Sequence, residues 1–353
     1  MHRTQFGGDP YADRRGNGVT RIVLSRNERS GRAWPDDAYE RVEDARDLVR
    51  RRSDPRAVSQ KPPVADVDKN ALLEPLHRLI GLSEVKAMIE ELYAYALIQN
   101  KRRVHQLRSD SSVWHMVFTG KPGTGKTTVA RILGQMFAAL GVLSKGHLVE
   151  AERADLVGEY IGHTAQKTRT LLDRAQGGIL FLDEAYSLSR GGEKDFGREA
   201  IDTLVKGLED RKDDLVVILA GYSQEMNDFL AINPGLCSRF PHHIAFPDFS
   251  ESELMQIAVR MLETREYALS PDAYIRLRHA LRRSRESLTF SNGRTVRNML
   301  DRAIRRHALR VVEERDPSRE MLMTLCANDL RDVDREDRAR GDKARDILQS
   351  VVH

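Results

Sequence analysis

The sequence has little cysteine, little tryptophan and no long apolar run. Only two of its 353 residues are cysteine, which excludes a disulfide-stapled fold and suits a reducing compartment. No stretch approaches the about 18 apolar residues of a transmembrane helix, and the first residues (MHRTQFGGDPYADRRG) contain no apolar segment of signal-peptide length. We therefore expect a soluble, cytoplasmic protein that does not insert into a membrane.

A large net charge of one sign is also missing. Lysine and arginine number 57 against 53 acidic residues, which leaves a formal net charge of +4. Recognition of nucleic acid would require a basic stripe, yet residues 248–327 mix 15 arginines with 12 acidic residues. We therefore expect no nucleic-acid partner.

Charge and hydrophobic periodicity together divide the chain into four parts. Residues 1–66 carry 25 charged side chains and too little apolar material for a core, so we expect a poorly ordered arm or a small accessory element. Residues 67–247 alternate apolar strands with amphipathic helices, and residues 248–327 show helical spacing only. Residues 328–353 hold 13 charged side chains of 26, which predicts a solvated tail.

The alternating segment predicts a mostly parallel sheet with helices on both faces. The expected strands are Val113–Thr119, His147–Ala151, Gly178–Asp183, Leu215–Ala220 and His243–Phe246. Two of the intervening helices are expected at about Thr164–Ala175 and Arg198–Glu209. The fold class is therefore α/β, a doubly wound parallel sheet followed by a small all-α domain.

The strongest motif is GKPGTGKT at residues 120–127, which matches G-x-x-x-x-G-K-[ST] between a predicted strand and a predicted helix. Backbone N–H groups of such a loop surround nucleotide phosphates, and the helix N-terminus adds partial positive charge. Lys126 would reach the β- and γ-phosphates, and the Thr127 hydroxyl would bind Mg²⁺. ATP and Mg²⁺ are thus the expected cofactors. The expected nucleotide-binding residues are Gly120, Lys121, Pro122, Gly123, Thr124, Gly125, Lys126, Thr127 and Thr128.

A second motif, GILFLDE, ends a buried strand on two carboxylates. Asp183 would hold Mg²⁺ and Glu184 would polarise the attacking water. An apolar run that ends in Asp-Glu is common by itself, but the P-loop upstream makes the pair a predicted hydrolytic site.

Both motifs belong to longer stretches that resemble the CbxX/CfqX family of AAA+ ATPases. The resemblance lies in LSKGHLVEAERADLVGEYIGHTAQKT, GGILFLDEAYSLSRGGEKDFGREAIDTLVK, VVILAGYSQEM, NPGLCSRFP and FSNGRTVRN, and it covers roughly residues 70–325. It implies an AAA+ P-loop NTPase core with a helical lid. It also implies a homo-oligomer, a hexameric ring, in which neighbouring subunits share ATPase sites.

The resemblance assigns further positions. Arg239 falls at the arginine finger, although an intramolecular salt bridge is an alternative. Arg294 matches the sensor-2 position, with Arg297 as the alternative on the same helix face. Tyr222 stands where relatives carry a polar sensor-1 residue, so it either orients water or only packs. Ile80 and Gly81 match a segment that covers adenine, or else they make a core contact.

Two loops resemble those that line the central pore of such rings. Tyr160, between Gly158 and Gly162, matches pore loop 1, unless its ring packs beneath its own loop. Residues 191–197 (GGEKDFG) are a weaker match to a second pore loop.

The resemblance implies an ATP-hydrolysing remodelling protein that acts on a protein substrate, whose identity the sequence does not give. Within the family, SRGGEKDFG and SNGRTVRN favour a sporulation branch over red-type Rubisco activases. A different class of function, a scaffold whose assembly is set by nucleotide, would not require the hydrolytic Glu184.

Overall fold

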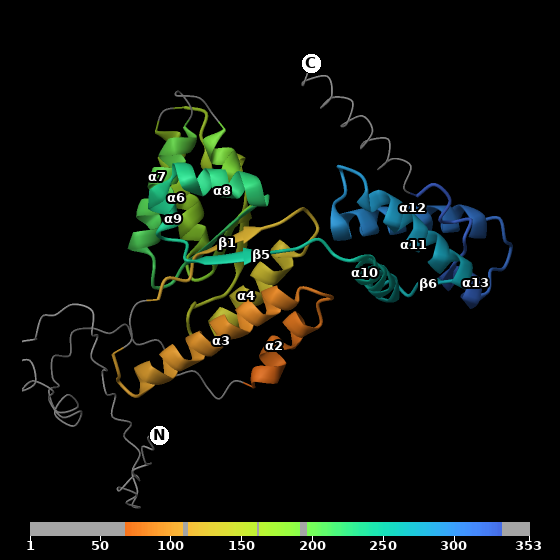
Figure 1. Cartoon of the computed structure of the whole chain (residues 1–353), viewed down its shortest axis with the longest axis horizontal. Coiled ribbons are helices and arrows are strands. Elements are labelled where there is room, and N and C mark those ends of the chain that lie inside the picture. Colours follow the sequence, from red (N-terminus) through yellow and green to blue (C-terminus); the bar gives the residue numbers. More distant parts are fainter. Residues whose placement is uncertain (1–67, 109–111, 161, 191–195, 334–353) are drawn as a thin grey trace, which may run out of the picture. The chain divides into compact units, whose positions relative to one another are not determined.

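The computed structural model describes residues 68–108, 112–160, 162–190 and 196–333 (Figure 1). The expected arm at 1–66 lies outside these residues, as do most of the expected tail and residues 191–195 of the expected second pore loop. No helix in the described ranges is long and apolar enough to cross a membrane.

Five parallel strands form the central sheet, in the order β2-β3-β4-β1-β5. They are β1 (Met116–Thr119), β2 (Leu148–Ala151), β3 (Ile179–Leu182), β4 (Val216–Gly221) and β5 (His242–Ala245). The predicted parallel α/β sheet is confirmed, with each strand within a few residues of its expected position. Because the chain leaves β1 for the far edge and then returns strand by strand, β1 lies at the point where strand order reverses. Ligands of open α/β sheets bind at that point, beyond the carboxyl ends of the strands.

Helices cover both faces of the sheet (Figure 1). Alternating side chains decide which face each strand residue meets: Met116 and Phe118 pack in one hydrophobic cluster, whereas Val117 packs in the other. The first cluster includes side chains of α2 (Lys69–His77), α3 (Ser83–Val104) and α4 (Lys126–Ala139). The second includes side chains of α5 (Arg153–Leu156), α6 (His163–Ala175), η2 (Ala185–Ser189), α7 (Gly197–Asp210), α8 (Ser223–Ile232) and α9 (Pro234–Cys237).

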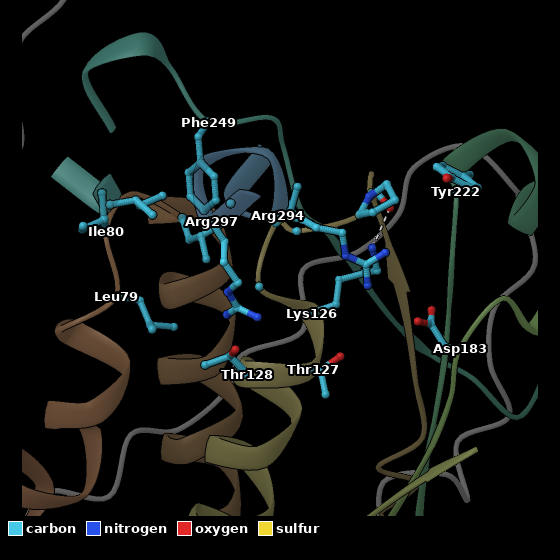
Figure 2. Close-up of a pocket in the computed structure, with 18 of the residues that line it drawn as sticks. Leu79, Ile80, Lys126, Thr127, Thr128, Asp183, Tyr222, Phe249, Arg294 and Arg297 are labelled. Atoms are coloured by element: carbon cyan, nitrogen blue, oxygen red, sulfur yellow. Dashed lines mark hydrogen bonds between the residues drawn. The ribbon is translucent and has the colours of Figure 1, made fainter. Parts of the chain in front are cut away.

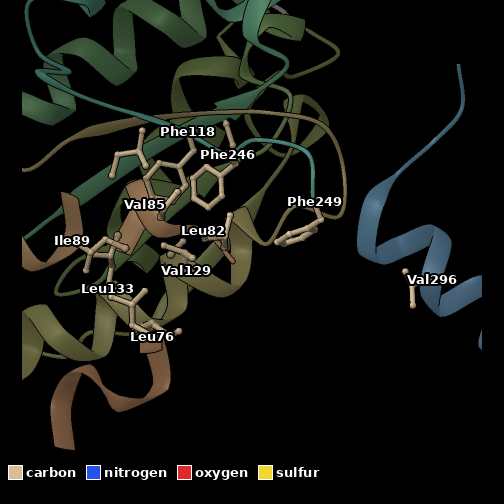
Figure 3. Close-up of a cluster of buried hydrophobic side chains, with 14 of the residues drawn as sticks. Leu76, Leu82, Val85, Ile89, Phe118, Val129, Leu133, Phe246, Phe249 and Val296 are labelled. Atoms are coloured by element: carbon tan, nitrogen blue, oxygen red, sulfur yellow. The ribbon is translucent and has the colours of Figure 1, made fainter. Parts of the chain in front are cut away.

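The first cluster fixes the P-loop helix against the sheet. The rings of Phe118 and Phe246 meet with centroids 5.0 Å apart, and Figure 3 shows them beside Val85 of α3 and Val129 of α4. Phe118 and Val129 are completely buried. Burying side chains of this size contributes roughly 1.5–3 kcal/mol each, so α4 begins at a fixed place after β1.

The segment after β5 is helical, as its periodicity predicts. It contains α10 (Glu251–Glu263), α11 (Pro271–Arg285), α12 (Asn292–Val311) and α13 (Arg319–Met323), with a short parallel pair, β6 (Ala268–Leu269) and β7 (Thr324–Leu325). Helix α10 starts with a capping box in which the Ser250 and Glu253 side chains accept each other's backbone N–H groups. Helix α11 starts with Ser270 as N-cap, followed by Pro271.

Packing of the helical segment continues beyond residue 327, into residues that we assigned to the tail. Leu330 and Val333 are buried, and the Asp329 carboxylate is paired with Arg310, with Oδ2 2.9 Å from Nη2. High charge content suggested a solvated tail, but the charge of Asp329 is neutralised by a partner on α12. Residues 328–333 therefore belong structurally to the helical segment.

Candidate functional site

The loop between β1 and α4 has the backbone shape that its glycines allow. The φ angles of Gly120, Gly123 and Gly125 are 147°, 74° and 99°. Residues other than glycine rarely adopt positive φ angles of this kind. Gly125 is the N-cap of α4, so the first N–H groups of the helix, which lack partners within it, face the loop. A helix N-terminus of this form binds phosphate groups.

Gly123 also brings the loop against the start of α12. A Cβ atom at this position would lie 2.2 Å from the backbone oxygen of Ser291 and 2.7 Å from the nitrogen of Arg294. The Gly293 N–H donates to the Gly123 carbonyl over 3.0 Å. The P-loop and the helical segment therefore touch, backbone to backbone, beside Arg294.

The two lysines of the loop have different partners. Lys126 Nζ donates to the carbonyl oxygens of Gly120 at 2.7 Å and Lys121 at 2.9 Å. Burial lowers the pKa of Lys126, Asp183 opposes that shift and Arg294 adds to it. Lys121 instead extends to Asp248, with 2.6 Å between Nζ and Oδ2. Only Lys126 presents its ammonium group within the loop.

The carboxylates after β3 lie beside the loop. The Asp183 side chain accepts the Glu184 N–H over 3.0 Å. Glu184 itself has a φ of 46° and a ψ of 44°, a left-handed conformation that is uncommon for a side chain of this type. Such conformations cost about 1–3 kcal/mol and persist where surrounding structure imposes them, often at active sites.

Two tyrosines stand next to these carboxylates. The rings of Tyr186 and Tyr222 have centroids 6.2 Å apart. Burial, reinforced by the negative charge of Glu184, raises the pKa of Tyr186 to about 12 and raises that of Tyr222 as well. Both hydroxyls therefore stay protonated at neutral pH and can donate hydrogen bonds. Tyr186 was not among the predicted site residues; its place two residues after the carboxylate pair was the available signal.

These groups surround one cavity of about 450 Å³, within the size range of ligand pockets. Its polar end is formed by the P-loop, Asp183, Glu184 and the tyrosines, and its apolar end by side chains of the α2–α3 turn and α10 (Figure 2). The apolar lining residues are Leu79, Ile80, Leu82, Phe249, Ile257 and Met261. A phosphate-binding end joined to an apolar end matches the two halves of a nucleotide.

The predicted residues divide between the cavity and its surroundings. The cavity is lined by Gly120, Pro122, Gly123, Thr124, Gly125, Lys126, Thr127, Thr128, Ile80, Asp183, Glu184, Tyr222, Arg294 and Arg297. Gly81, with φ 64°, makes the turn behind Ile80 instead, where a Cβ atom would lie 2.2 Å from Glu253 Oε1. Leu82 was not predicted, because its left-handed backbone (φ 58°) has no marker in the sequence.

Both candidate arginines of α12 reach the cavity. Figure 2 shows Arg294 extending beside Lys126, while Arg297 points toward Thr128. The positive charge of Arg294 adds to the lowering of the Lys126 pKa by burial, and it partly opposes the rise in the pKa of Tyr222. Its position beside the phosphate-binding lysine supports Arg294 as the sensor and leaves Arg297 on the side of the apolar lining.

Arg239 lies away from this cavity. Its guanidinium forms an ion pair with Glu209 and donates from Nη1 to the Gly235 carbonyl over 2.8 Å. Its Nε is buried without a hydrogen-bond partner among the described residues. Within one chain, the structure therefore contains the salt bridge that was the alternative to an arginine finger.

Tyr160 projects into solvent. Its side chain is 66% exposed, and its only described ring contact is an edge-on approach to His163, with centroids 5.5 Å apart. Neighbouring Gly162 has φ 84° and nothing within 4 Å of a Cβ position. The ring is therefore not packed beneath its own loop.

The oxygen donors at the polar end fit Mg²⁺. Thr127 offers a hydroxyl and Asp183 a carboxylate, both hard ligands. No group of three or more His, Cys, Asp or Glu side chains able to hold a metal occurs in the part of the chain that the structure describes. The donor set thus suits a cation held by one hydroxyl, one carboxylate and nucleotide phosphates, as Mg²⁺ often is.

A P-loop, a carboxylate pair at the end of a neighbouring strand and a helical segment that contributes an arginine define a P-loop ATPase with a lid. Residues 116–248 match the AAA family (ATPase family associated with various cellular activities), and residues 250–340 match the AAA lid domain.

Relatives of known name cover most of the chain. Stage V sporulation protein K of Bacillus subtilis (strain 168) is 52% identical over 269 residues, 74% of this chain and 84% of that protein. Protein CbbX of Cereibacter sphaeroides is 49% identical, covering 68% and 78%. The chloroplastic ribulose bisphosphate carboxylase/oxygenase activase of Cyanidioschyzon merolae (strain NIES-3377 / 10D) is 44% identical, covering 73% and 90%. The chain belongs to the AAA ATPases, in the family of stage V sporulation protein K and the CbbX, CfxQ and CbxX proteins.

Solved structures agree on the fold. The AAA domain of FIGL-1 in complex with ADP superposes with a TM-score of 0.52 at 15% identity, covering 82% of this chain and 99% of that one. A point mutant of Thermotoga maritima RuvB gives 0.51 at 17% identity, covering 79% and 78%. The predicted AAA+ core with a helical lid and ATPase activity are confirmed.

Proposed function

We propose that this ATPase works as a ring, a hexamer, that uses ATP and Mg²⁺ to remodel a protein substrate passing through its centre. The observation that carries the proposal is the 66% exposure of Tyr160 on a loop between Gly158 and Gly162. An exposed aromatic ring with a polar hydroxyl can contact an extended polypeptide of any sequence, and Gly158 and Gly162, two residues to either side of Tyr160, carry no side chain.

The residues of the cavity divide the work of hydrolysis. Lys126 and the loop N–H groups hold the phosphates, and Thr127 with Asp183 holds Mg²⁺, which supplies charge neutralisation when bound. Glu184 accepts the proton of the attacking water. The backbone of Arg294 lies in the lid beside Gly123, and its side chain lines the cavity. Arg294 therefore links the lid to the phosphate end of the cavity.

Hydrolysis in P-loop sites is accelerated by an arginine that approaches the γ-phosphate from outside the cavity, and Arg239 is the proposed source. Because Arg239 lies outside the cavity of its own chain, we place it at the site of a neighbouring subunit. Its pair with Glu209 does not prevent this, because the Glu209 side chain is 61% exposed and solvent weakens its attraction for the guanidinium.

Two biological settings fit this chemistry. We favour a cytoplasmic sporulation role because the sequences SRGGEKDFG and SNGRTVRN resemble the sporulation branch of the family. Activation of Rubisco is supported to the same degree by the relatives, which include both a sporulation protein and Rubisco activases at 44–52% identity. The Asp183-Glu184 pair gives no support to a scaffold that only binds nucleotide.

The test uses a substrate trap in native cells. Glu184→Gln should bind ATP but hydrolyse it about 10²–10⁴-fold more slowly, so that substrate stays engaged. Proteins captured by Glu184→Gln are compared with those captured by Glu184→Gln/Tyr160→Ala and by the matched control Glu184→Gln/Tyr160→Phe.

We expect a substrate that the Phe control retains and the Ala variant loses, while Tyr160→Ala alone keeps its ATPase rate. Capture that is indifferent to Tyr160→Ala would refute the pore role. A sporulation factor among the lost proteins supports the favoured setting, and the Rubisco large subunit would replace it with Rubisco activation.

A further inference from the structure

A row of polar contacts joins the P-loop to the lid outside the nucleotide cavity. Lys121 Nζ lies 2.6 Å from Asp248 Oδ2, and Asn292 Nδ2 donates to Asp248 Oδ1 over 2.8 Å. The Phe249 N–H donates to Asn292 Oδ1 over 3.0 Å. The carboxylate of Asp248 therefore binds the P-loop with one oxygen and the first residue of α12 with the other.

Asn292 is unusual in its burial and in its backbone. It is completely buried and has a φ of 46°, a left-handed conformation that asparagine tolerates better than most residues other than glycine because its short amide can hydrogen-bond locally. Both ends of its amide are hydrogen-bonded, to the strand-to-lid connection at Asp248 and Phe249. Removing one partner of a buried polar pair leaves the other unsatisfied, which makes these contacts costly to lose.

The same turn positions Arg294. The residue after Asn292 donates its N–H to the Gly123 carbonyl, and Arg294 follows directly and enters the cavity beside Lys126 (Figure 2). Two sets of contacts thus connect the P-loop to one turn of the lid. One is the backbone hydrogen bond from Gly293 to Gly123, and the other passes from Lys121 through Asp248 to Asn292. Any shift of Asn292 moves the backbone from which Arg294 extends.

We propose that Asp248 is a positioning residue that couples the P-loop to the lid, and that through Lys121 and Asn292 it sets where Arg294 meets the phosphates. The carboxylate is held ionised for this purpose: burial alone would raise the pKa of Asp248, but hydrogen bonds from Lys121 and Asn292 bring it below its usual value. The proposal rests on ATP hydrolysis and not on the proposed protein substrate.

The contrary view is that Lys121 and Asp248 form an ordinary surface ion pair, with side chains 54% and 33% exposed. The chain offers a matched control in Arg131 and Glu150, whose Nη2 and Oε1 atoms are 2.8 Å apart with side chains 60% and 53% exposed. That pair joins α4 to β2 within the core and does not reach the lid.

The experiment measures KM and kcat for ATP with the full chain in Lys121→Met, Asp248→Asn and the double variant, and in Arg131→Met, Glu150→Gln and their double. We expect each change at Lys121 or Asp248 to raise KM about five- to tenfold. The KM of the double variant should not exceed that of Asp248→Asn, because both changes break the same ion pair between Lys121 and Asp248. Lys121→Arg retains a positive charge opposite Asp248 and should keep the KM of the parent. The KM of each control variant should stay within about twofold of the parent value.

A second readout needs no nucleotide. Hydrogen exchange of the Gly293 amide, which donates to Gly123, should become about five- to tenfold faster in Lys121→Met and remain unchanged in Arg131→Met. Lys121→Met also decides the matter if Asp248→Asn fails to fold, since Lys121 is more than half exposed.

Additive effects of Lys121→Met and Asp248→Asn on KM would overturn the proposal. So would a lower melting temperature in Asp248→Asn with KM and Gly293 exchange unchanged, because Asp248 would then only support the fold. Neither result depends on whether a protein substrate is remodelled.

Discussion

Substituting Gly123 by alanine tests whether the P-loop and lid are joined as the structure shows. At φ 74° an L-residue is strained by about 1–2 kcal/mol, whatever its surroundings. In addition, the new Cβ would lie 2.2 Å from the Ser291 oxygen, whereas real Cβ atoms essentially never approach another atom below 3.0 Å. Both close atoms belong to backbone, so the lid turn must retreat by about 0.8 Å, the shortfall from that limit.

The retreat moves the backbone nitrogen of Arg294, which lies 2.7 Å from the same Cβ position. Misplacing a catalytic group by about an ångström can cost up to about 10²-fold in rate, so we expect kcat/KM for ATP to fall about 10- to 100-fold in Gly123→Ala. Gly162→Ala is the matched control: its φ is 84°, but its Cβ would meet nothing within 4 Å.

The assay is steady-state ATP hydrolysis beside thermal unfolding, for both variants and the parent. Gly162→Ala should lose only stability, by the strain of its left-handed backbone. Gly123→Ala should lose more stability, because its Cβ also meets the lid backbone, and most of its kcat/KM. Equal kcat/KM in the two variants would show that the contact between Gly123 and the lid turn does not set the geometry of hydrolysis.

Two further predictions concern a buried histidine and the metal. Burial lowers the pKa of His115 to about 4, with a smaller contribution from His242, so the unfolded chain binds a proton below pH 6.5 that the folded chain does not. The free energy of unfolding should therefore fall by about 2 kcal/mol between pH 7 and pH 5 because of His115. Denaturant titrations of His115→Gln should lack this part of the pH dependence. Thr127→Ala removes one of two proposed Mg²⁺ ligands, so half-maximal hydrolysis should require roughly tenfold more Mg²⁺, and an unchanged requirement would remove Thr127 from the metal site.

The phosphate end of the site was predictable because its parts are local. GKPGTGKT and the Asp183-Glu184 pair each lie within a few residues of a strand end, and a parallel sheet brings those ends together. The contacts between loop and lid were not predictable in the same way. Lys121 and Asp248 are 127 residues apart, and nothing in their immediate neighbours indicates that they meet.

Backbone conformation at residues other than glycine was also not predictable from the sequence. Leu82, Glu184 and Asn292 all have positive φ angles, which sequence marks reliably only at glycine. The charge of residues 328–333 misled for a related reason: composition counts Asp329 as solvated, whereas packing against α12 pairs it with Arg310. In both cases the deciding partner lies far away in the sequence.

The central claim, that neighbouring subunits complete each ATPase site, is tested most directly by mixing two inactive chains. Glu184→Gln lacks the proposed base but retains Arg239, whereas Arg239→Ala retains the base but lacks the arginine. If Arg239 acts on a neighbour, an equal mixture regains hydrolysis at roughly one quarter of its sites, those where an intact Glu184 adjoins an intact Arg239. A mixture no more active than its two components measured separately would contradict the account.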